Sequence, residues 1–332
     1  MSTKNIAVIG CGSWGTAVAN VFCDAGSSVT LWGRDAITVD EILKLHMNSK
    51  YLKGFKLSPS LKASTDLNGT IAEADWVVCS IPTQQIRKVF SPVAKELAGK
   101  PLINTSKGIE VGTNATVSEI FAEVAPSSPY IILSGPSFAQ EVVQHLPTLV
   151  TLASKNESVL KEVQHQLSTP YFRAYRSTDV PGVELAGALK NVVAIASGMV
   201  TGLKLGYNAQ AAIINRGIAE ITRMGLKRGA DPMTFLGLAG MGDLILTCTG
   251  PLSRNRRVGV SLGEGKKLAD IQRELGGVAE GVYTAQSAFE LAQKSGIEMP
   301  ITEQVNKIIY RDGTPQKALS ELMSRGLKEE WA

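Results

Sequence analysis

The stretch GCGSWGTA at residues 10–17 constrains the fold of this chain more than any other feature. It places three glycines as Gly10-x-Gly12-x-x-Gly15, which begin at the last residue of the apolar run IAVIG and end where a segment with helical periodicity starts. In such a unit the first glycine permits a tight turn and the second lets the backbone approach a pyrophosphate. The third lets the helix pack close to the strand, and the free N–H groups of the helix face the phosphates. We therefore predict a dinucleotide-binding turn here.

Short apolar runs alternate with helical segments through the first half of the chain. The runs are continuous, as is typical of parallel strands covered on both faces. They lie at 6–10, 29–32, 76–81, 101–105, 130–134, 148–153 and 171–175, with helices expected at 15–25, 84–98, 114–124 and 157–167. This alternation predicts an α/β fold with an N-terminal, Rossmann-type, doubly wound and mainly parallel sheet, which forms a dinucleotide-binding domain over residues 1–186.

The second half of the chain has almost no strand pattern. In the segment NAQAAIINRGIAEITRMGLKRG, apolar residues recur at intervals of three and four and predict one apolar helix face, formed by Ala211, Ile214, Ile218 and Ile221. Residues 283–294 and 302–311 also have helical periodicity. We predict an all-helical C-terminal domain over residues 187–332, which would bind the substrate and carry the catalytic group.

The charge and cysteine content limit the class of partner. A net charge of +4 over 332 residues suits an anionic small molecule and is too weak to indicate nucleic-acid binding. The four cysteines form no CxxC pair, so we expect reduced, buried thiols and no metal site. The N-terminal apolar run is too short for a signal peptide, and no stretch reaches the roughly 18 apolar residues of a bilayer span. We therefore expect a cytoplasmic protein without integral membrane contact.

The end of the second predicted strand bears on the choice of cofactor. An acidic residue there binds the ribose 2′-hydroxyl of NAD, whereas an arginine accommodates the 2′-phosphate of NADP. The sequence reads LWGRD and offers both Arg34 and Asp35. Arg34 favours NADP, and Asp35 leaves NAD open.

A lysine is the best candidate for the general acid/base of a nicotinamide-dependent reaction. The three histidines, His46, His145 and His165, are scattered and are expected to be surface or packing residues. Lys190 and Asn191 instead interrupt the otherwise small and apolar segment ELAGALKNVVAIASG. Such a lysine either extends its charge to solvent or serves a site, and we favour the site.

Polar groups also gather in three loops where a ligand is expected. NTSKGIE carries Lys107 and SGPSFAQE carries Gly135 and Ser137, each directly after a predicted strand, at the sheet edge where α/β proteins bind ligands. Capped turns of no further function would give the same pattern. The glycine-rich stretch GLAGMGDLILTCTGPLSRNRRVG resembles either an anion site or a solvated basic turn.

Together these stretches resemble one family, the bacterial NAD(P)-dependent glycerol-3-phosphate dehydrogenases. The similarity rests on GCGSWGTA, LWGRD, SKGIE, GPSFAQEV, ELAGALKNVVAIASG, GLAGMGDLILTCTGPLSRNRRVG and VAEGVYTA, which follow one another from residue 10 to about residue 285. The resemblance implies interconversion of dihydroxyacetone phosphate and sn-glycerol 3-phosphate with NADP(H), or NAD(H), in a homodimer without a metal. It also implies a supply of glycerol 3-phosphate for phospholipid synthesis.

The resemblance further implies roles for individual residues. Lys190 would be the catalytic acid/base. The implied substrate contacts are Lys107, Gly135, Ser137, Asn191, Asp243, Ser253, Arg254 and Asn255. The implied cofactor contacts are Gly10, Gly12, Ser13, Trp14, Gly15, Arg34, Lys107, Ala139, Arg254, Val278 and Glu280.

Two alternatives remain open from the sequence. A related two-domain dehydrogenase of the 3-hydroxyacid or 6-phosphogluconate type would also use a lysine base, but the segment 237–259 does not resemble those families. A non-catalytic NADP-sensing protein would keep the fold without needing a general base.

Overall fold

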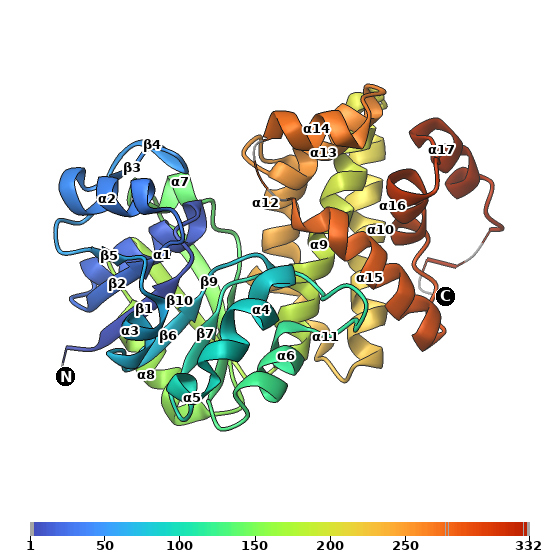
Figure 1. Cartoon of the computed structure of the whole chain (residues 1–332). Coiled ribbons are helices and arrows are strands. Elements are labelled where there is room, and N and C mark those ends of the chain that lie inside the picture. Colours follow the sequence, from blue (N-terminus) through green and yellow to red (C-terminus); the bar gives the residue numbers. More distant parts are fainter. Residues whose placement is uncertain (1–2, 276, 278, 328, 331–332) are drawn as a thin grey trace.

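The computed structural model describes residues 3–275, 277, 279–327 and 329–330. It consists of a sheet-containing part and a helical part that lie side by side (Figure 1). The main sheet contains eight strands: β1 (Asn5–Ile9), β2 (Ser28–Trp32), β5 (Lys62–Ser64), β6 (Trp76–Cys79), β7 (Leu102–Asn104), β8 (Tyr130–Ser134), β9 (Thr148–Ala153) and β10 (Phe172–Ser177).

The strand order is β10-β9-β8-β7-β6-β1-β2-β5, and only the β8–β9 pair is antiparallel. The order turns back at β1, which pairs with β2 on one side and β6 on the other. This is the doubly wound, mainly parallel sheet predicted from the sequence, and the fold class is confirmed.

Helices cover both faces of this sheet and explain its continuous apolar strands. Ile6 and Val8 of β1 pack in one buried cluster, whereas Ala7 and Ile9 pack in another on the opposite face. The helices of this part are α1 (Ser13–Asp24), α2 (Ala36–Leu45), α3 (Leu67–Ala72), α4 (Ile86–Phe90), α5 (Ala94–Leu97), α6 (Val117–Val124), α7 (Ala139–Val142) and α8 (Glu157–Leu167), with 3₁₀ turns η1 (Thr83–Gln85) and η2 (Ser91–Val93).

The structure corrects the prediction of one long helix at 84–98. This segment is divided into η1, α4, η2 and α5. Pro92 lies in η2 and has no N–H to donate, so one continuous helix cannot form through it. Strand β5 and the hairpin of β3 (Met47–Asn48) and β4 (Leu52–Lys56) were not predicted, because these strands are short and contain no continuous apolar run.

The second part is helical, and no strand follows β10 among the residues that the structure describes. Its elements are α9 (Val180–Gly202), α10 (Gly206–Lys227), α11 (Pro232–Leu236), the π-helical turn η3 (Leu238–Gly242), α12 (Asp243–Thr249), α13 (Arg254–Gly263), α14 (Leu268–Leu275), α15 (Glu280–Ser295), α16 (Pro300–Tyr310) and α17 (Pro315–Met323). Helix α9 runs without interruption through residues 186–187, so the change from strand to helix comes just before Val180.

Helix α9 is the central helix of this part. By length and composition alone it could cross a membrane, contrary to the expectation that no stretch is long and apolar enough, but its most apolar 18-residue window is completely buried inside the protein. Helices α10, α12, α13 and α15 pack around it. The apolar face predicted for α10 is only partly correct, since Ile218 and Ile221 are buried but Ala211 is exposed.

Glycines let α13 pack closely against α9. A Cβ atom on Gly198 would lie 2.1 Å from the Arg256 carbonyl oxygen, and one on Gly259 would lie 2.0 Å from that of Ile195. Neither position therefore admits a side chain without moving the helices apart. This close crossing brings the start of α13 beside the middle of α9, where Lys190 is located.

Candidate active site

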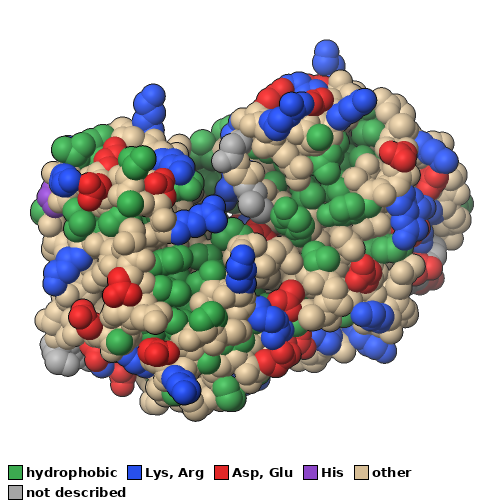
Figure 2. Space-filling view, in the orientation of Figure 1, with side chains coloured by type: hydrophobic (Ala, Val, Ile, Leu, Met, Phe, Trp, Pro, Cys, Tyr) green, Lys and Arg blue, Asp and Glu red, His purple; other side chains and the backbone are tan. Residues whose placement is uncertain are grey.

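The candidate site lies where the carboxyl ends of the central strands face the helical part. Gly10 follows β1, Lys107 lies three residues after β7, and Gly135 follows β8. Figure 2 shows a hollow in the molecular surface between the two parts. Ligands of doubly wound sheets bind at this edge, near the point where the strand order turns back.

The glycine turn has the backbone that the sequence predicted. Gly10 adopts φ +121°, and its N–H donates to the Trp32 carbonyl oxygen at 3.0 Å. A Cβ on Gly15 would lie 1.9 Å from the Gly10 carbonyl oxygen, so α1 can pack against the turn only with glycine there. At Gly12, by contrast, a Cβ would meet no atom within 4 Å, and this open space borders the first residues of α1.

Unpaired polar atoms at this turn and beside Gly108 fit a dinucleotide. Gly12 is the N-cap of α1 and supplies no side chain, so the helix N-terminus is open to an anion. The Trp14 Nε1 atom is buried without a hydrogen-bond partner among the described residues. Glu280 accepts from the Thr83 N–H at 3.2 Å, yet its second oxygen and the Thr83 hydroxyl are buried and unpaired. Burial raises the pKa of Glu280 to about 7.

The residues after β2 differ in their availability to a ribose. Asp35 is the N-cap of α2, and its carboxylate accepts from the Ile37 N–H, the Thr38 hydroxyl and Lys50 Nζ. Arg34 is exposed beside it. The carboxylate is therefore already engaged, whereas the guanidinium group faces solvent.

A buried cluster of two lysines and one carboxylate lies across the boundary of the two parts. Asp243, at the start of α12, accepts from Lys190 of α9 at 2.8 Å and from Lys107 at 2.6 Å. The two lysines bond to opposite oxygens of the carboxylate. Lys190 also donates to the Thr247 hydroxyl at 2.7 Å, and that hydroxyl donates to the Asp243 carbonyl oxygen at 2.6 Å.

The cluster shifts the acidity of its members. Burial lowers the pKa of Lys190 to about 8, the attraction of Asp243 works in the opposite direction, and the positive charge of Lys107 lowers it further. Burial alone would raise the pKa of Asp243, but Lys107 and Lys190 hold it below its ordinary value. The site therefore combines an anionic carboxylate with a lysine that titrates near neutral pH, which suits proton transfer.

Side-chain amides extend the site from Lys107 to α15. Asn191 donates to the Lys107 carbonyl oxygen at 3.3 Å and accepts from Asn255 at 2.9 Å. Asn255 in turn accepts from the Gly281 N–H at 2.9 Å. Ser253 caps α13 by accepting from the Arg256 N–H, and Arg254 is exposed in the first turn of that helix.

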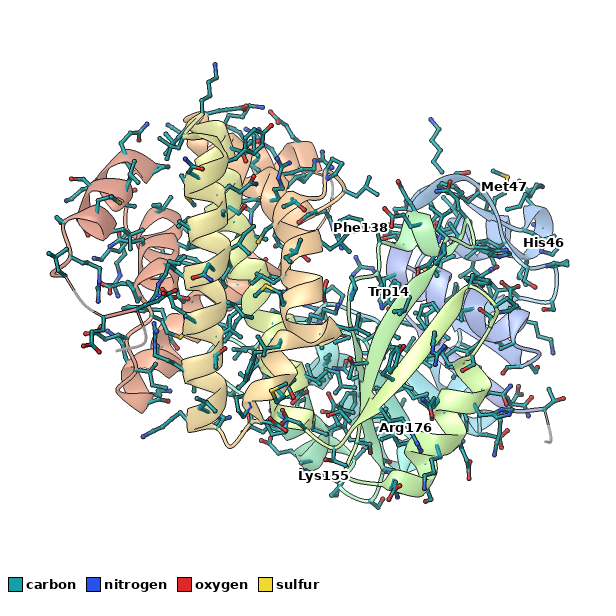
Figure 3. All side chains as sticks on the ribbon, turned by 180° about the vertical axis from the view of Figure 1, so that it is seen from behind. Trp14, His46, Met47, Phe138, Lys155 and Arg176 are labelled. Atoms are coloured by element: carbon teal, nitrogen blue, oxygen red, sulfur yellow. The ribbon has the colours of Figure 1, made fainter. Side chains whose placement is uncertain are left out.

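The loop after β8 closes the site on the sheet side. Gly135 has φ +148°, and its carbonyl oxygen accepts from Lys107 Nζ at 3.4 Å and from the Ser137 hydroxyl at 2.9 Å. Ala139 begins α7, which packs against α1. Phe138 contacts Gly250 of the helical part, and Figure 3 shows Trp14 and Phe138 on the side of the sheet-containing part that faces the helices.

Comparisons with known proteins agree with this architecture. Family models described as the N-terminus and C-terminus of NAD-dependent glycerol-3-phosphate dehydrogenase match residues 5–160 and 179–320. The chain belongs to this family. It is 49% identical over 332 residues to the glycerol-3-phosphate dehydrogenase [NAD(P)+] of Geobacter sulfurreducens, with 99% of each chain covered.

Solved glycerol-3-phosphate dehydrogenases share the whole fold. The crystal structure of the Coxiella burnetii enzyme superposes with a TM-score of 0.94 at 40% identity and covers 97% of this chain and 99% of that one. The Saccharomyces cerevisiae enzyme gives a TM-score of 0.82 at 30% identity, covering 98% and 100%. The resemblance stated from the sequence motifs is thus confirmed.

Hydrogen bonds join part of the predicted dehydrogenase site, and they also show what sequence reasoning missed. Lys107, Lys190 and Asp243 form one cluster, and Asn191 and Asn255 adjoin it. Val278 lies outside the described residues. Thr247 was one of the donors in the glycine-rich stretch 237–259 but was given no role, although its spacing of four residues from Asp243 on one helix would have placed the two side by side.

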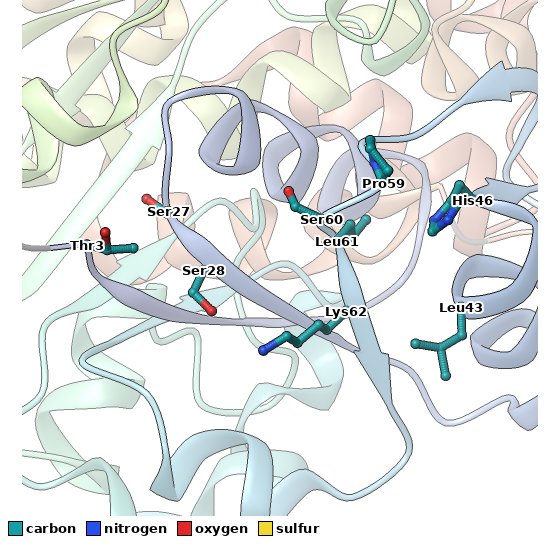
Figure 4. Close-up of a pocket in the computed structure, with 9 residues that line it drawn as sticks. All are labelled: Thr3, Ser27, Ser28, Leu43, His46, Pro59, Ser60, Leu61 and Lys62. Carbon is teal, nitrogen blue, oxygen red and sulfur yellow. The ribbon is translucent and has the colours of Figure 1, made fainter.

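Other features of the surface do not compete with this site. The pocket in Figure 4 is lined by Thr3, Ser27, Ser28, Leu43, His46, Pro59, Ser60, Leu61 and Lys62. Ser28 and Lys62 begin their strands, so the pocket lies at the amino ends, away from the lysine cluster. Within the described part of the chain, no group of three or more His, Cys, Asp or Glu side chains is placed to hold a metal ion. All four cysteines are buried and free.

Proposed function

We propose that this enzyme interconverts dihydroxyacetone phosphate and sn-glycerol 3-phosphate, with reduction as the direction that supplies phospholipid synthesis. The observation that carries the proposal is the buried Lys190–Asp243–Lys107 cluster at the ligand-binding edge of a dinucleotide-type sheet. When bound, the nicotinamide cofactor supplies or accepts the hydride.

Lys190 is the proton donor in this proposal. An ammonium group carries three protons, and the contacts with Asp243 and Thr247 use two of them. The third proton is left for an oxygen of the ligand. Because Thr247 donates its own proton to the Asp243 backbone, its hydroxyl presents a lone pair to Lys190 and fixes the direction of the ammonium group. Asp243 holds Lys190 in place and offsets part of its desolvation.

Cationic and amide groups around the cluster bind the rest of the substrate. We assign the phosphate to Arg254, whose guanidinium group suits bidentate contact and lies in the first turn of α13. Asn191 and Asn255 orient one another and each retains a second amide proton for substrate oxygens. Gly135, Ser137 and Ser253 complete the substrate contacts.

The cofactor is proposed to be NADP(H), with NAD(H) also accepted. The engagement of Asp35 by Lys50 and two further donors supports this choice, since an acceptor for the NAD ribose hydroxyls is already occupied. The proposed contacts are Ser13, Trp14, Ala139 and Glu280, together with Arg34 and the glycine turn. Domain roles follow: residues 1–186 bind the cofactor and residues 187–332 bind substrate, in a cytoplasmic homodimer.

The test is a direct assay of NADPH and NADH oxidation by dihydroxyacetone phosphate, run in parallel. We expect rapid oxidation that is faster at equal concentration with NADPH. A 3-hydroxyacid oxidation assay and a 6-phosphogluconate assay serve as controls for the related dehydrogenases. Protein that binds NADPH but does not oxidise it with dihydroxyacetone phosphate would contradict the proposed substrate, whether or not it reduces NADP+ with a 3-hydroxyacid or with 6-phosphogluconate.

A further inference from the structure

A second buried carboxylate, Glu184, lies in the early part of α9 and has no role in the chemistry described above. Its side chain is 5% exposed. One oxygen accepts from the Ser118 N–H at 2.9 Å and from the Tyr130 hydroxyl at 2.5 Å, and the other accepts from the Ser118 hydroxyl at 2.5 Å. Glu184 thus joins α9 to the start of α6 and to strand β8.

The Tyr130 hydroxyl continues this chain of hydrogen bonds toward the active site. It accepts from the Asn104 amide at 3.0 Å, at the end of β7. The same Asn104 side chain accepts from the Ser106 N–H at 2.9 Å and donates to the Ser106 carbonyl oxygen at 3.1 Å. Both backbone groups of the residue before Lys107 are therefore held by one amide, which Tyr130 orients.

Helix α9 carries both Glu184, where this chain of hydrogen bonds begins, and Lys190. Lys190 follows Glu184 by six residues, or about 9 Å along the helix axis. Lys107, at the other end of the chain of bonds, meets Lys190 at the carboxylate of Asp243. Because one rigid helix holds Lys190 directly and the backbone before Lys107 through Glu184, it sets the separation of the two lysines.

We propose that Glu184, acting through Tyr130 and Asn104, is a positioning residue that fixes Lys107 relative to Lys190. The proposal rests on the function of the lysine cluster given above. It assigns no contact with substrate or cofactor to Glu184.

The bonding pattern makes a specific distinction between two substitutions. In Glu184→Gln, the amide oxygen can still accept from the Ser118 N–H and Tyr130, while the amide nitrogen donates to the Ser118 hydroxyl, which is able to accept. Glu184→Ala leaves all these donors without their acceptor. A positioning role therefore predicts rescue by Gln, whereas a role of the negative charge predicts that Gln fails.

The chain offers matched controls. Glu220 is also buried and accepts from the Ile301 and Thr302 N–H groups at the start of α16, but among the described residues no hydrogen bond joins it to Lys107. The Tyr171 hydroxyl donates to Asp24 at 2.6 Å, a bond of the same type as that of Tyr130. Glu220→Ala removes the acceptor of three hydrogen bonds, as Glu184→Ala does. Tyr171→Phe removes a hydroxyl that donates to a carboxylate, as Tyr130→Phe does.

The experiment measures kcat with dihydroxyacetone phosphate, the Kd for NADPH, and hydrogen–deuterium exchange of segment 104–110 in each variant. We expect Glu184→Ala and Tyr130→Phe to lower kcat by roughly tenfold to a hundredfold, to speed exchange in the segment, and to leave the Kd within about twofold. Their double variant should lose no more than the worse single variant. Glu184→Gln and both controls should stay within about twofold of the wild-type kcat.

Four results would overturn the proposal: unchanged kcat in Tyr130→Phe, unchanged exchange in Tyr130→Phe, equal loss in Glu220→Ala, or failure of Glu184→Gln to rescue. If Glu184→Ala does not fold, Tyr130→Phe and Glu184→Gln still decide the question. The exchange measurement needs no substrate, so it tests the role of Glu184 separately from the proposed function. A wild-type enzyme inactive on dihydroxyacetone phosphate would refute the proposed function. Unchanged exchange in Tyr130→Phe would refute the role of Glu184.

Discussion

The ammonium group of Lys190 lies 2.8 Å from one carboxylate oxygen of Asp243, and both side chains are buried. The other oxygen of that carboxylate is taken by Lys107. One anion thus lies between two cations, which keeps Asp243 charged. Burial, together with the charge of Lys107, outweighs the attraction of Asp243 and lowers the pKa of Lys190 to about 8. A lysine in this state can give a proton in one direction of a reaction and take it back in the other.

Replacing Lys190 by alanine removes the proposed proton donor. We expect Lys190→Ala to lower kcat by about 10²–10⁴-fold, since this is the usual contribution of a positioned acid or base. The Kd for NADPH should change little, because Lys190 lies in the helical part, away from the glycine turn. Steady-state kinetics and fluorescence titration measure the two quantities. Lys161→Ala, at an exposed lysine of α8, is the control, and a parallel fall in cofactor affinity would contradict the role.

The pH dependence of the two directions follows from the pKa of Lys190 of about 8. Reduction needs the protonated ammonium group, so kcat for dihydroxyacetone phosphate should fall as the pH rises through about 8. Oxidation of glycerol 3-phosphate needs the neutral amine, so its kcat should rise over the same range. Because the charge of Lys107 lowers this pKa, Lys107→Met should move both limbs to higher pH. Identical pH profiles of kcat in the two directions would show that Lys190 does not transfer the proton.

Local patterns in the sequence were sufficient for most of the sheet and for the glycine turn. Strands β8 and β9 begin and end where their apolar runs do, and Gly10 has the positive φ that the motif requires. These features depend on neighbouring residues along the chain. The hairpin β3–β4 was missed because its strands are short and contain no continuous apolar run, and because it is held by pairing outside the main sheet.

Contacts between distant segments were harder to predict. Thr247 joins the site only because α12 packs against α9, which brings its hydroxyl to Lys190 across 57 positions of sequence. Considered separately, Tyr130 is predicted to lie on a strand and Glu184 on a helix. The hydrogen bond between them depends on how the sheet packs against α9. Side-chain chemistry suggested which residues to consider, whereas tertiary packing decided which of them meet.

Alanine substitutions at two glycines of the nucleotide turn should have different effects, one on stability and the other on cofactor binding. A Cβ at Gly15 would lie 1.9 Å from the Gly10 carbonyl oxygen, so Gly15→Ala should destabilise the fold and lower Tm. At Gly12 a Cβ meets no atom within 4 Å, so Gly12→Ala should fold normally but obstruct the pyrophosphate. Thermal unfolding and NADPH titration separate the two effects. A Gly12→Ala protein with normal Tm and normal NADPH affinity would show that the pyrophosphate does not bind at Gly12.

Arg34 should decide between the two cofactors. Its exposed guanidinium group is free to approach a 2′-phosphate, and loss of such a charge-assisted contact costs about 1.5–3 kcal/mol. We therefore expect Arg34→Ala to lower kcat/KM for NADPH by roughly tenfold to a hundredfold and to leave that for NADH nearly unchanged. Arg176→Ala, at an exposed arginine of β10, is the matched control. Equal losses with both cofactors would mean that Arg34 contacts a part common to them.

Lys50 should influence the same preference for NADPH over NADH through its contact with Asp35. Its ammonium group lies 2.8 Å from Asp35 and holds the pKa of that carboxyl below its ordinary value. In Lys50→Met the carboxylate loses this partner and becomes available to the 2′-hydroxyl of NADH, while its uncompensated charge repels a 2′-phosphate. The ratio of kcat/KM for NADPH to that for NADH should therefore fall, and Lys50→Met combined with Asp35→Asn should restore it in part. An unchanged ratio in Lys50→Met would show that Asp35 does not face the ribose, and the preference would then rest on Arg34 alone.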